Sequence, residues 1–119
     1  MFRGFLDELL ATTSGAFASM FLDWEGETVQ LVCDRDISDH DLRIIGAYQG
    51  VFFDRLRNHC RKTKIGPPLR FLLEFKEVLI LNIDVKDKYY IVMLLDADAN
   101  EEAAWEQLES TRTKLLTEL

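Results

Sequence analysis

The stretch that decides the fold is VLILNIDVKDKYYIVMLL, residues 78–95. It contains two runs, Val78–Ile83 and Tyr89–Leu95, that are apolar at nearly every position and are separated by the mostly charged residues 84–88. Strands with apolar side chains on both sides are usually covered on both faces of their sheet. The two runs therefore predict neighbouring buried strands with further elements packed above and below them.

The preceding segment predicts a long helix followed by a third strand. Ser38-Asp39-His40-Asp41 has the pattern of a helix start, in which the Ser38 hydroxyl and the Asp41 carboxylate serve free backbone amides. The helix is expected to run to about Lys62, because Gly66-Pro67-Pro68 cannot continue it. The apolar run Leu69–Phe75 then predicts a strand.

The two ends of the chain predict a hairpin and two more helices. Apolar residues recur at helical spacing before Ser14-Gly15, and Ala16–Trp24 and Thr28–Cys33 surround a glycine-centred turn. Asp98 or Asn100 can cap a last helix. The residues that share one face are Phe2, Phe5, Leu6, Leu9 and Leu10 in the first helix, and Trp105, Leu108, Arg112, Leu115 and Leu119 in the last.

The predicted fold class is α/β, a three-layer α-β-α sandwich with the order α-β-β-α-β-β-β-α. Short connections make the strand pairs antiparallel, which gives a five-stranded antiparallel sheet. We expect the middle helix on one face and the two terminal helices on the other. A chain of 119 residues fits a single domain over residues 1–119.

The charge balance argues against nucleic acid as a partner. The formal net charge is −7, whereas a surface that follows phosphates needs clustered Lys and Arg. The only basic cluster comprises Arg55, Arg57, Arg61, Lys62 and Lys64. Positive charges in the last turns of a helix favour the negative end of its dipole, which is the simpler interpretation of this cluster.

The cysteines and the apolar segments predict a cytoplasmic protein. Cys33 and Cys60 form no CxxC pair and have too few neighbouring ligands for a metal site, so we expect two reduced, buried thiols. The first residues lack the pattern of a signal peptide. No apolar segment approaches the roughly 20 residues of a membrane span, so insertion into a membrane is not expected.

No pattern of catalytic residues stands out, and we expect neither an enzyme nor a cofactor. The sequence lacks the GxxxxGK[ST], GxGxxG, GxSxG and HExxH motifs. His40 and His59 are the only histidines, and a nucleophilic dyad would depend on a chance tertiary contact. We therefore assign no catalytic and no metal-binding residue.

The middle helix has more apolar surface than one sheet requires. At about 100° per residue, a core stripe comprises Leu42, Ile45, Phe52, Phe53, Leu56 and Cys60. Ile44, Tyr48 and Val51 lie beside it and widen the apolar arc to roughly half of the circumference, beyond what a surface helix needs. Either a loop or sheet edge of the same chain covers these residues, or a second protomer does.

Gly46 and Gly50 are unusual, because each glycine inside a helix costs up to about 1 kcal/mol relative to alanine. They lie one turn apart and form, with Ala47, a strip of small residues that we expect to bind a partner. The alternative is that they fit under a bulky neighbour of the same domain. The charged residues expected to flank the strip are Arg43, Asp54 and Arg57.

The hairpin sequence GAFASMFLDWEGETV, residues 15–29, resembles the first hairpin of the Roadblock family. This family includes the dynein Roadblock light chains and the bacterial MglB-type proteins. A small-residue start leads there into an apolar strand, an acidic turn with glycine and a second strand. The order of elements, the small residues of the middle helix and the strand Val78–Ile83 are also similar to the family.

The resemblance implies a homodimer. In the family the middle helices lie side by side, and the third strands pair to form one ten-stranded sheet. A long apolar edge strand is also an aggregation hazard unless it is paired. The corresponding positions here are Ile44, Tyr48, Val51 and Arg55 on the helix, and Leu69, Phe71 and Leu73 in the edge strand Leu69–Phe75.

The resemblance also implies a partner, a Ras-like small GTPase of the MglA type, whose GTP hydrolysis bacterial members modulate without being enzymes themselves. The strip of Gly46, Ala47 and Gly50 suits such docking, although no arginine finger is evident. Two alternatives stay open. One is a dimeric scaffold of a motor or signalling complex, and the other is a small-molecule sensor with a polar cavity in its core.

Overall fold

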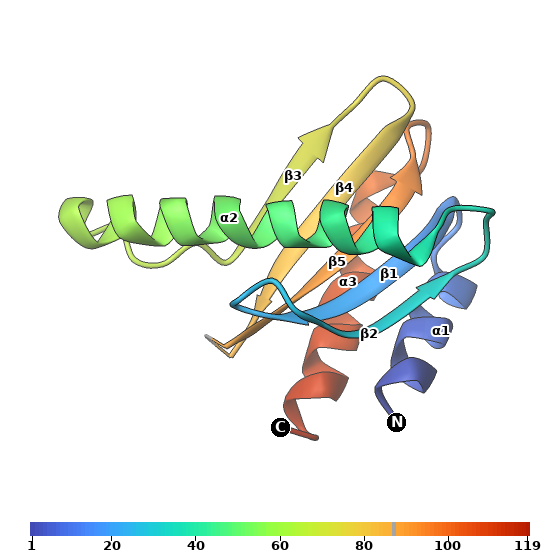
Figure 1. Ribbon diagram of the computed structural model, residues 1–119, viewed down its shortest axis with the longest axis horizontal. Coiled ribbons are helices and arrows are strands. Elements are labelled where there is room, and N and C mark those ends of the chain that lie inside the picture. The colour runs from blue at the N-terminus through green and yellow to red at the C-terminus, as the bar shows by residue number, and fades with distance from the viewer. Residues whose placement is uncertain (87) are drawn as a thin grey trace.

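The computed structural model describes residues 1–86 and 88–119, and Figure 1 shows their arrangement. The expected order α-β-β-α-β-β-β-α is confirmed. Asp87, in the predicted turn between the last two strands, lies outside the described residues. The elements are α1 (Phe2–Thr12), β1 (Ala16–Asp23), β2 (Thr28–Cys33), α2 (Asp39–Thr63), β3 (Arg70–Glu74), β4 (Val78–Val85), β5 (Tyr89–Asp96) and α3 (Glu101–Leu116).

The strands form one antiparallel sheet with the order β2-β1-β5-β4-β3. The two apolar runs of the deciding stretch are β4 and β5, and they pair from Val78 with Asp96 to Val85 with Tyr89. Both lie inside the sheet, whereas β2 and β3 are its edges. This position explains why β4 and β5 are apolar on both sides.

The sheet separates two apolar cores, as the sequence predicts for a three-layer sandwich. One core joins α1 and α3 to the strands, with Leu6, Leu9, Leu108 and Leu115 fully or almost fully buried. The other lies under α2, which crosses the opposite face alone (Figure 1). The expected distribution of the three helices over the two faces is therefore confirmed.

Side-chain caps start α2 and α3. The Ser38 hydroxyl accepts a hydrogen bond from the Asp41 N–H at 3.1 Å, as predicted. Of the two candidates for the last helix, Asn100 is the cap, and its side-chain oxygen accepts from the Ala103 N–H at 3.0 Å. Each bond satisfies an amide that has no partner within the helix.

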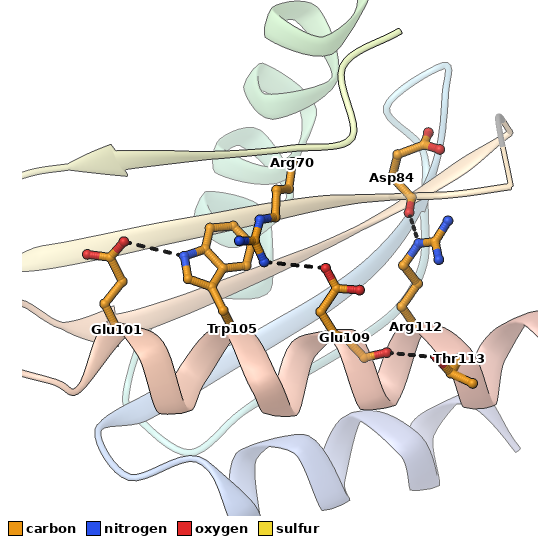
Figure 2. Close-up of polar contacts among 7 residues, drawn as sticks. All are labelled: Arg70, Asp84, Glu101, Trp105, Glu109, Arg112 and Thr113. Carbon is orange, nitrogen blue, oxygen red and sulfur yellow. Dashed lines mark hydrogen bonds and ion pairs between the residues drawn. The ribbon is translucent and has the colours of Figure 1, made fainter. Parts of the chain in front are cut away.

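Polar contacts join α3 to the sheet along its length (Figure 2). The Arg70 guanidinium lies 4.4 Å from the centre of the Trp105 ring and forms an ion pair with Glu109 at 3.4 Å. Nearer the end of the helix, the Arg112 Nε donates to the Asp84 carbonyl at 2.6 Å. Arg112 therefore contacts the sheet through a hydrogen bond of its guanidinium as well as through the aliphatic part of its side chain.

The predicted burial of the two thiols is wrong, because Cys33 and Cys60 are both half-buried. Cys33 ends the edge strand β2, and Cys60 lies in the last turns of α2. Leu119 is likewise outside the predicted helical face, since α3 ends at Leu116.

Candidate interaction surface on helix α2

Helix α2 turns its small residues toward the sheet. Gly46 and Gly50 are buried on this side with Leu42 and Phe53, and Gln49 and Arg57 complete the buried set. A Cβ atom at Gly46 would lie 2.9 Å from a methyl carbon of Leu22, and one at Gly50 would lie 2.6 Å from the Tyr90 hydroxyl oxygen. The glycines therefore allow α2 to lie close to β1 and β5.

Tyr90 fixes the height of the helix above the sheet. Its hydroxyl donates a hydrogen bond to the Gly46 carbonyl at 2.8 Å, and its side chain is fully buried. Burial raises the pKa of the Tyr90 phenol far above its ordinary value, so the hydroxyl stays a donor even at alkaline pH. The expectation that Gly46 and Gly50 form an exposed strip is wrong, and the alternative of a bulky neighbour within the domain describes them.

The flank of α2 next to the β1–β2 turn is polar. Arg43 and Asp54 are exposed there, and Ala47 lies half-buried with its Cβ 3.4 Å from the position of a Cβ at Gly26. A shallow hollow of about 370 Å³ lies between Gly26, Ala47, Asp54 and their neighbours. Of the six predicted partner-binding residues, only Arg43, Ala47 and Asp54 are therefore placed where a partner can touch them.

Arg57 does not belong to that exposed flank. Only 7% of the residue is exposed, and its guanidinium lies 3.5 Å from the centre of the Trp24 ring. A planar guanidinium over an indole face is a favourable cation–π geometry. The prediction that Arg57 flanks a docking strip is corrected accordingly, because the residue packs α2 against the β1–β2 turn.

Large apolar side chains of α2 are left outside. Ile44, Tyr48 and Val51 are 43%, 61% and 45% exposed, and no loop of the described chain covers them. Phe52 and Leu56, predicted to face the core, are exposed as well. The helix is rotated relative to the prediction, because its glycines rather than its bulky residues approach the sheet. These five residues are the α2 ridge, and the exposed Arg55 lies among them.

The structure brings the α2 ridge close to the edge strand β3. Leu69, just before the strand, is 67% exposed. Phe71 and Leu73 are half-buried, and the Phe71 ring lies 4.7 Å from the Phe53 ring, centre to centre. Their side chains thus belong partly to the core under α2, and the feature left open at β3 is its backbone edge.

An apolar groove opens between α2 and the β3–β4 hairpin. Its volume is about 690 Å³. The sequence does not predict this groove, because its pattern places Phe52 in the core and Phe75 at the end of a strand. The spacing of Gly46 and Gly50, aligned with Leu42 and Phe53, was the signal that could have shown the true inner face. The groove is lined by Ile45, Tyr48 and Phe52 of α2 on one side and by Leu73, Phe75 and Val78 of the hairpin on the other.

The described residues offer little for chemistry. Within residues 1–86 and 88–119, no three His, Cys, Asp or Glu side chains gather where they could hold a metal ion. His40 and His59 are both exposed and lie near opposite ends of α2. In the same part of the chain, no helix has the length and apolar character needed to span a bilayer.

No family model matches the chain, and no curated protein does either. Solved structures do match. MglB of Myxococcus xanthus has a TM-score of 0.87 at 9% sequence identity, covering 98% of this chain and 92% of that one. The Roadblock/LC7 domain from Streptomyces avermitilis has a TM-score of 0.83 at 10% identity, covering 94% and 92%. MglC from Myxococcus xanthus has a TM-score of 0.69 at 24% identity, covering 99% and 98%.

These structures match the backbone of the chain over nearly its whole length. At such low identities the likeness concerns the backbone and not the side chains of any site. The chain therefore has the Roadblock/LC7 fold, in the form also found in MglB.

Proposed function

We propose that this protein is a homodimeric regulator that binds a Ras-like small GTPase and modulates its GTP hydrolysis. The observation that carries the proposal is the α2 ridge, a row of exposed apolar side chains beside an open strand edge. Exposed apolar patches on a helix and unpaired strand edges both favour association. A second copy, related by a twofold axis, covers both features at once.

The likeness to MglB supports the proposed self-association. One of the matching solved structures shows MglB in a tetrameric arrangement, so that protein associates with itself. For the present chain we assign the dimer contact to Ile44, Tyr48, Val51 and Arg55 of α2 together with the β3 edge. We assign GTPase docking to Arg43, Ala47 and Asp54 on the polar flank.

The first test is the mass of the protein in solution with a matched pair of variants. Val51 and Val29 are both valines, 45% and 44% exposed, but Val29 lies on the opposite edge strand β2. We expect the wild type and Val29→Arg to be dimers and Val51→Arg to be a monomer with unchanged circular dichroism. A monomeric wild type would overturn the dimer and with it the proposed function.

The second test measures GTP turnover by an MglA-type GTPase with and without this protein. We expect a changed hydrolysis rate with the wild type and with Val29→Arg. Asp54→Arg should remain a dimer but lose the effect, since Asp54 is exposed on the polar flank. Binding without any change in turnover would instead support the scaffold, and no binding at all would contradict the choice of partner.

A further inference from the structure

A basic hollow lies where the C-terminal end of α2, the segment that follows it and the β1–β2 turn meet. Its volume is about 550 Å³, which is within the range of small-molecule sites. It shares no residue with the groove at the β3–β4 hairpin. Three of its lining residues are cationic and none is acidic. The residues that matter here are Trp24, Arg57, Cys60, Arg61, Lys64 and Pro67.

The segment that supplies most of the basic hollow has no acid of its own. Residues 55–73 contain six Lys and Arg side chains and no Asp or Glu, although the chain as a whole has a net charge of −7. Neither Arg61 nor Lys64 forms an ion pair with any other described residue. Because cations that share one hollow repel each other, an anion between them is stabilising.

The helix dipole accounts for only part of this charge. Arg61 and Lys62 lie in the last turn of α2, where positive side chains favour the negative end of the dipole. Lys62 does this without lining the hollow. Arg57 lies before the last turn and is buried, so the dipole does not explain why it meets Arg61 and Lys64. The dipole also opposes a bound anion, but by less than one charge-assisted hydrogen bond contributes.

Arg57 and Trp24 give the hollow a fixed wall. The Arg57 guanidinium is held 3.5 Å from the centre of the Trp24 ring, and only 7% of the residue is exposed. A planar guanidinium that is already in place loses little freedom when it binds an anion. The Trp24 Nε1 is a buried donor that meets no acceptor within residues 1–86 and 88–119. An acceptor oxygen of a ligand would satisfy this donor.

We infer that the basic hollow binds a small organic phosphate, a phosphate monoester on an apolar or aromatic body. Such a group has a charge of about −1.5 to −2 at pH 7 and three acceptor oxygens, which suits Arg57, Arg61 and Lys64. A carboxylate, with one charge and two oxygens, balances less of the positive charge. The apolar body finds Cys60 and Pro67 in the same lining. The inference is independent of the homodimer and of the GTPase.

Phenyl phosphate is the probe for the first test. Its binding is followed by the fluorescence of Trp24 in a Trp105→Phe background, which leaves Trp24 as the only tryptophan. We expect saturable binding, with a Kd about tenfold or more below that of benzoate, which has a single charge. Inorganic phosphate, which lacks the apolar body, should also bind more weakly. The absence of saturable binding, or equal Kd values for the three anions, would overturn the inference.

A matched pair of lysines tests the position of the anion. Lys62 and Lys64 are both exposed and lie two residues apart, but only Lys64 lines the hollow. We expect Lys64→Gln to raise the Kd about tenfold and Lys62→Gln to change it by about twofold or less. Lys64→Arg keeps the charge and should bind as the wild type does. Equal rises for both Gln variants would show general attraction to a basic helix end and would overturn the site.

The two cysteines provide a readout that does not depend on fluorescence. Both are half-buried, but only Cys60 lines the hollow, so Cys33 is an internal control. Phenyl phosphate at ten times its Kd should slow the alkylation of Cys60 by iodoacetamide about tenfold and leave Cys33 unchanged, as measured by mass spectrometry. Equal rates at Cys60 with and without the ligand would place the anion elsewhere and overturn the inference.

The same assays separate a free phosphate ester from a phosphorylated protein. A peptide that contains one phosphotyrosine presents the same phosphate on an aromatic ring, together with its flanking residues. We expect its Kd to lie within about threefold of that of phenyl phosphate, because the hollow accounts for the contact with the ring and the phosphate. A Kd tenfold or more below that of phenyl phosphate would identify a phosphorylated protein as the partner and would overturn the small molecule.

Discussion

One face of the sheet is closed and the other is not. On the closed face, α1 and α3 lie against each other and the strands, and Leu6, Leu9 and Leu108 are fully or almost fully buried. On the open face α2 lies alone, and it leaves the α2 ridge and a groove of about 690 Å³ uncovered. The difference is one of width. Five strands span about 19 Å from the first to the last, whereas one helix is about 10 Å across.

The comparison shows which face of the sheet contributes most to the stability of the domain and which face leaves apolar surface available for binding. Two helices are wide enough to cover one face, so the core beneath them is complete within a single chain. One helix covers about half of the other face. Because Gly46 and Gly50 draw α2 down onto β1 and β5, the strands nearer the β3 edge receive less cover. The following predictions test this contrast, starting from the largest expected effect.

The closed face should be the more sensitive to loss of an apolar side chain. Leu108 is fully buried under α3, so Leu108→Ala should lower the free energy of unfolding by about 2–5 kcal/mol. Phe52 on the open face is 38% exposed, and Phe52→Ala should cost about 1 kcal/mol or less within one chain. Urea denaturation at a protein concentration low enough to prevent association measures both. Equal losses of unfolding free energy in the two variants would show that the two faces of the sheet are equally well covered.

The contact between α2 and the sheet can be tested with three glycines. Gly50→Ala should lower the free energy of unfolding by about 1–3 kcal/mol, because its Cβ would meet the fixed Tyr90 hydroxyl. Gly46→Ala should cost less, since the side chains of Leu22 and Met20 can move aside. Gly4, which has nothing within 4 Å, is the control in α1, and Gly4→Ala should stabilise by about 0.5–1 kcal/mol.

If Gly50→Ala stabilises as much as Gly4→Ala, α2 is not held close to β5 by Tyr90. The double variant Tyr90→Phe/Gly50→Ala checks the cause, because removing the hydroxyl removes the obstacle. Its loss of stability should be smaller than the sum of the two single losses. Additive losses would show that the hydroxyl and the Gly50 position do not interact.

Alkaline pH should lower the free energy of unfolding, because Tyr90 on the open face ionises. Its pKa in the folded protein is raised by burial, whereas in the unfolded chain it is about 10. The stabilising effect of the neutral phenol is therefore complete below pH 10 and is lost as the pH rises toward the folded pKa. In that range the stability should fall by up to about 1.4 kcal/mol per pH unit from this group. Tyr90→Phe should show a correspondingly smaller fall, and identical slopes would contradict the role of Tyr90.

The smallest effect is expected for the polar contacts on the outside of the closed face. Arg70 lies over the Trp105 ring and pairs with Glu109, but the two charged side chains are about half exposed (Figure 2). Arg70→Gln should lower the free energy of unfolding by about 1 kcal/mol or less, and less still at high salt. A larger loss in thermal denaturation would show that these contacts, and not the apolar core, hold α3 in place.

Most of the fold could be predicted from local patterns. Three of its features can be recognised from residues that are neighbours in the sequence. They are the apolar runs of β4 and β5, the Ser38 cap, and the end of a helix before Gly66-Pro67-Pro68. Such signals depend on the period of the side chains and on backbone freedom, so they survive without knowledge of distant contacts. The order of layers followed from them, because strands that are apolar on both sides need cover on both faces.

The orientation of α2 could not be predicted in the same way. Its apolar arc is wide enough to allow several rotations, and the assignment of Phe52 and Leu56 to the core was one of them. The deciding residue, Tyr90, lies 40 or more positions away along the chain, in β5. The Tyr90 hydroxyl has room only because Gly46 and Gly50, on the side of α2 that faces the sheet, carry no side chain. This requirement becomes visible only when β5 and α2 are in contact.

The sequence by itself determined the elements, their order and the presence of surplus apolar surface on the middle helix, because helical and strand periods are local properties. Only the tertiary structure decided where that surplus lies. The packing of Tyr90 against Gly50, and of Arg57 over Trp24, sets the rotation of α2. That rotation turns the small residues inward and the α2 ridge outward, because a helix lies closest to a sheet along the side that has the least bulk.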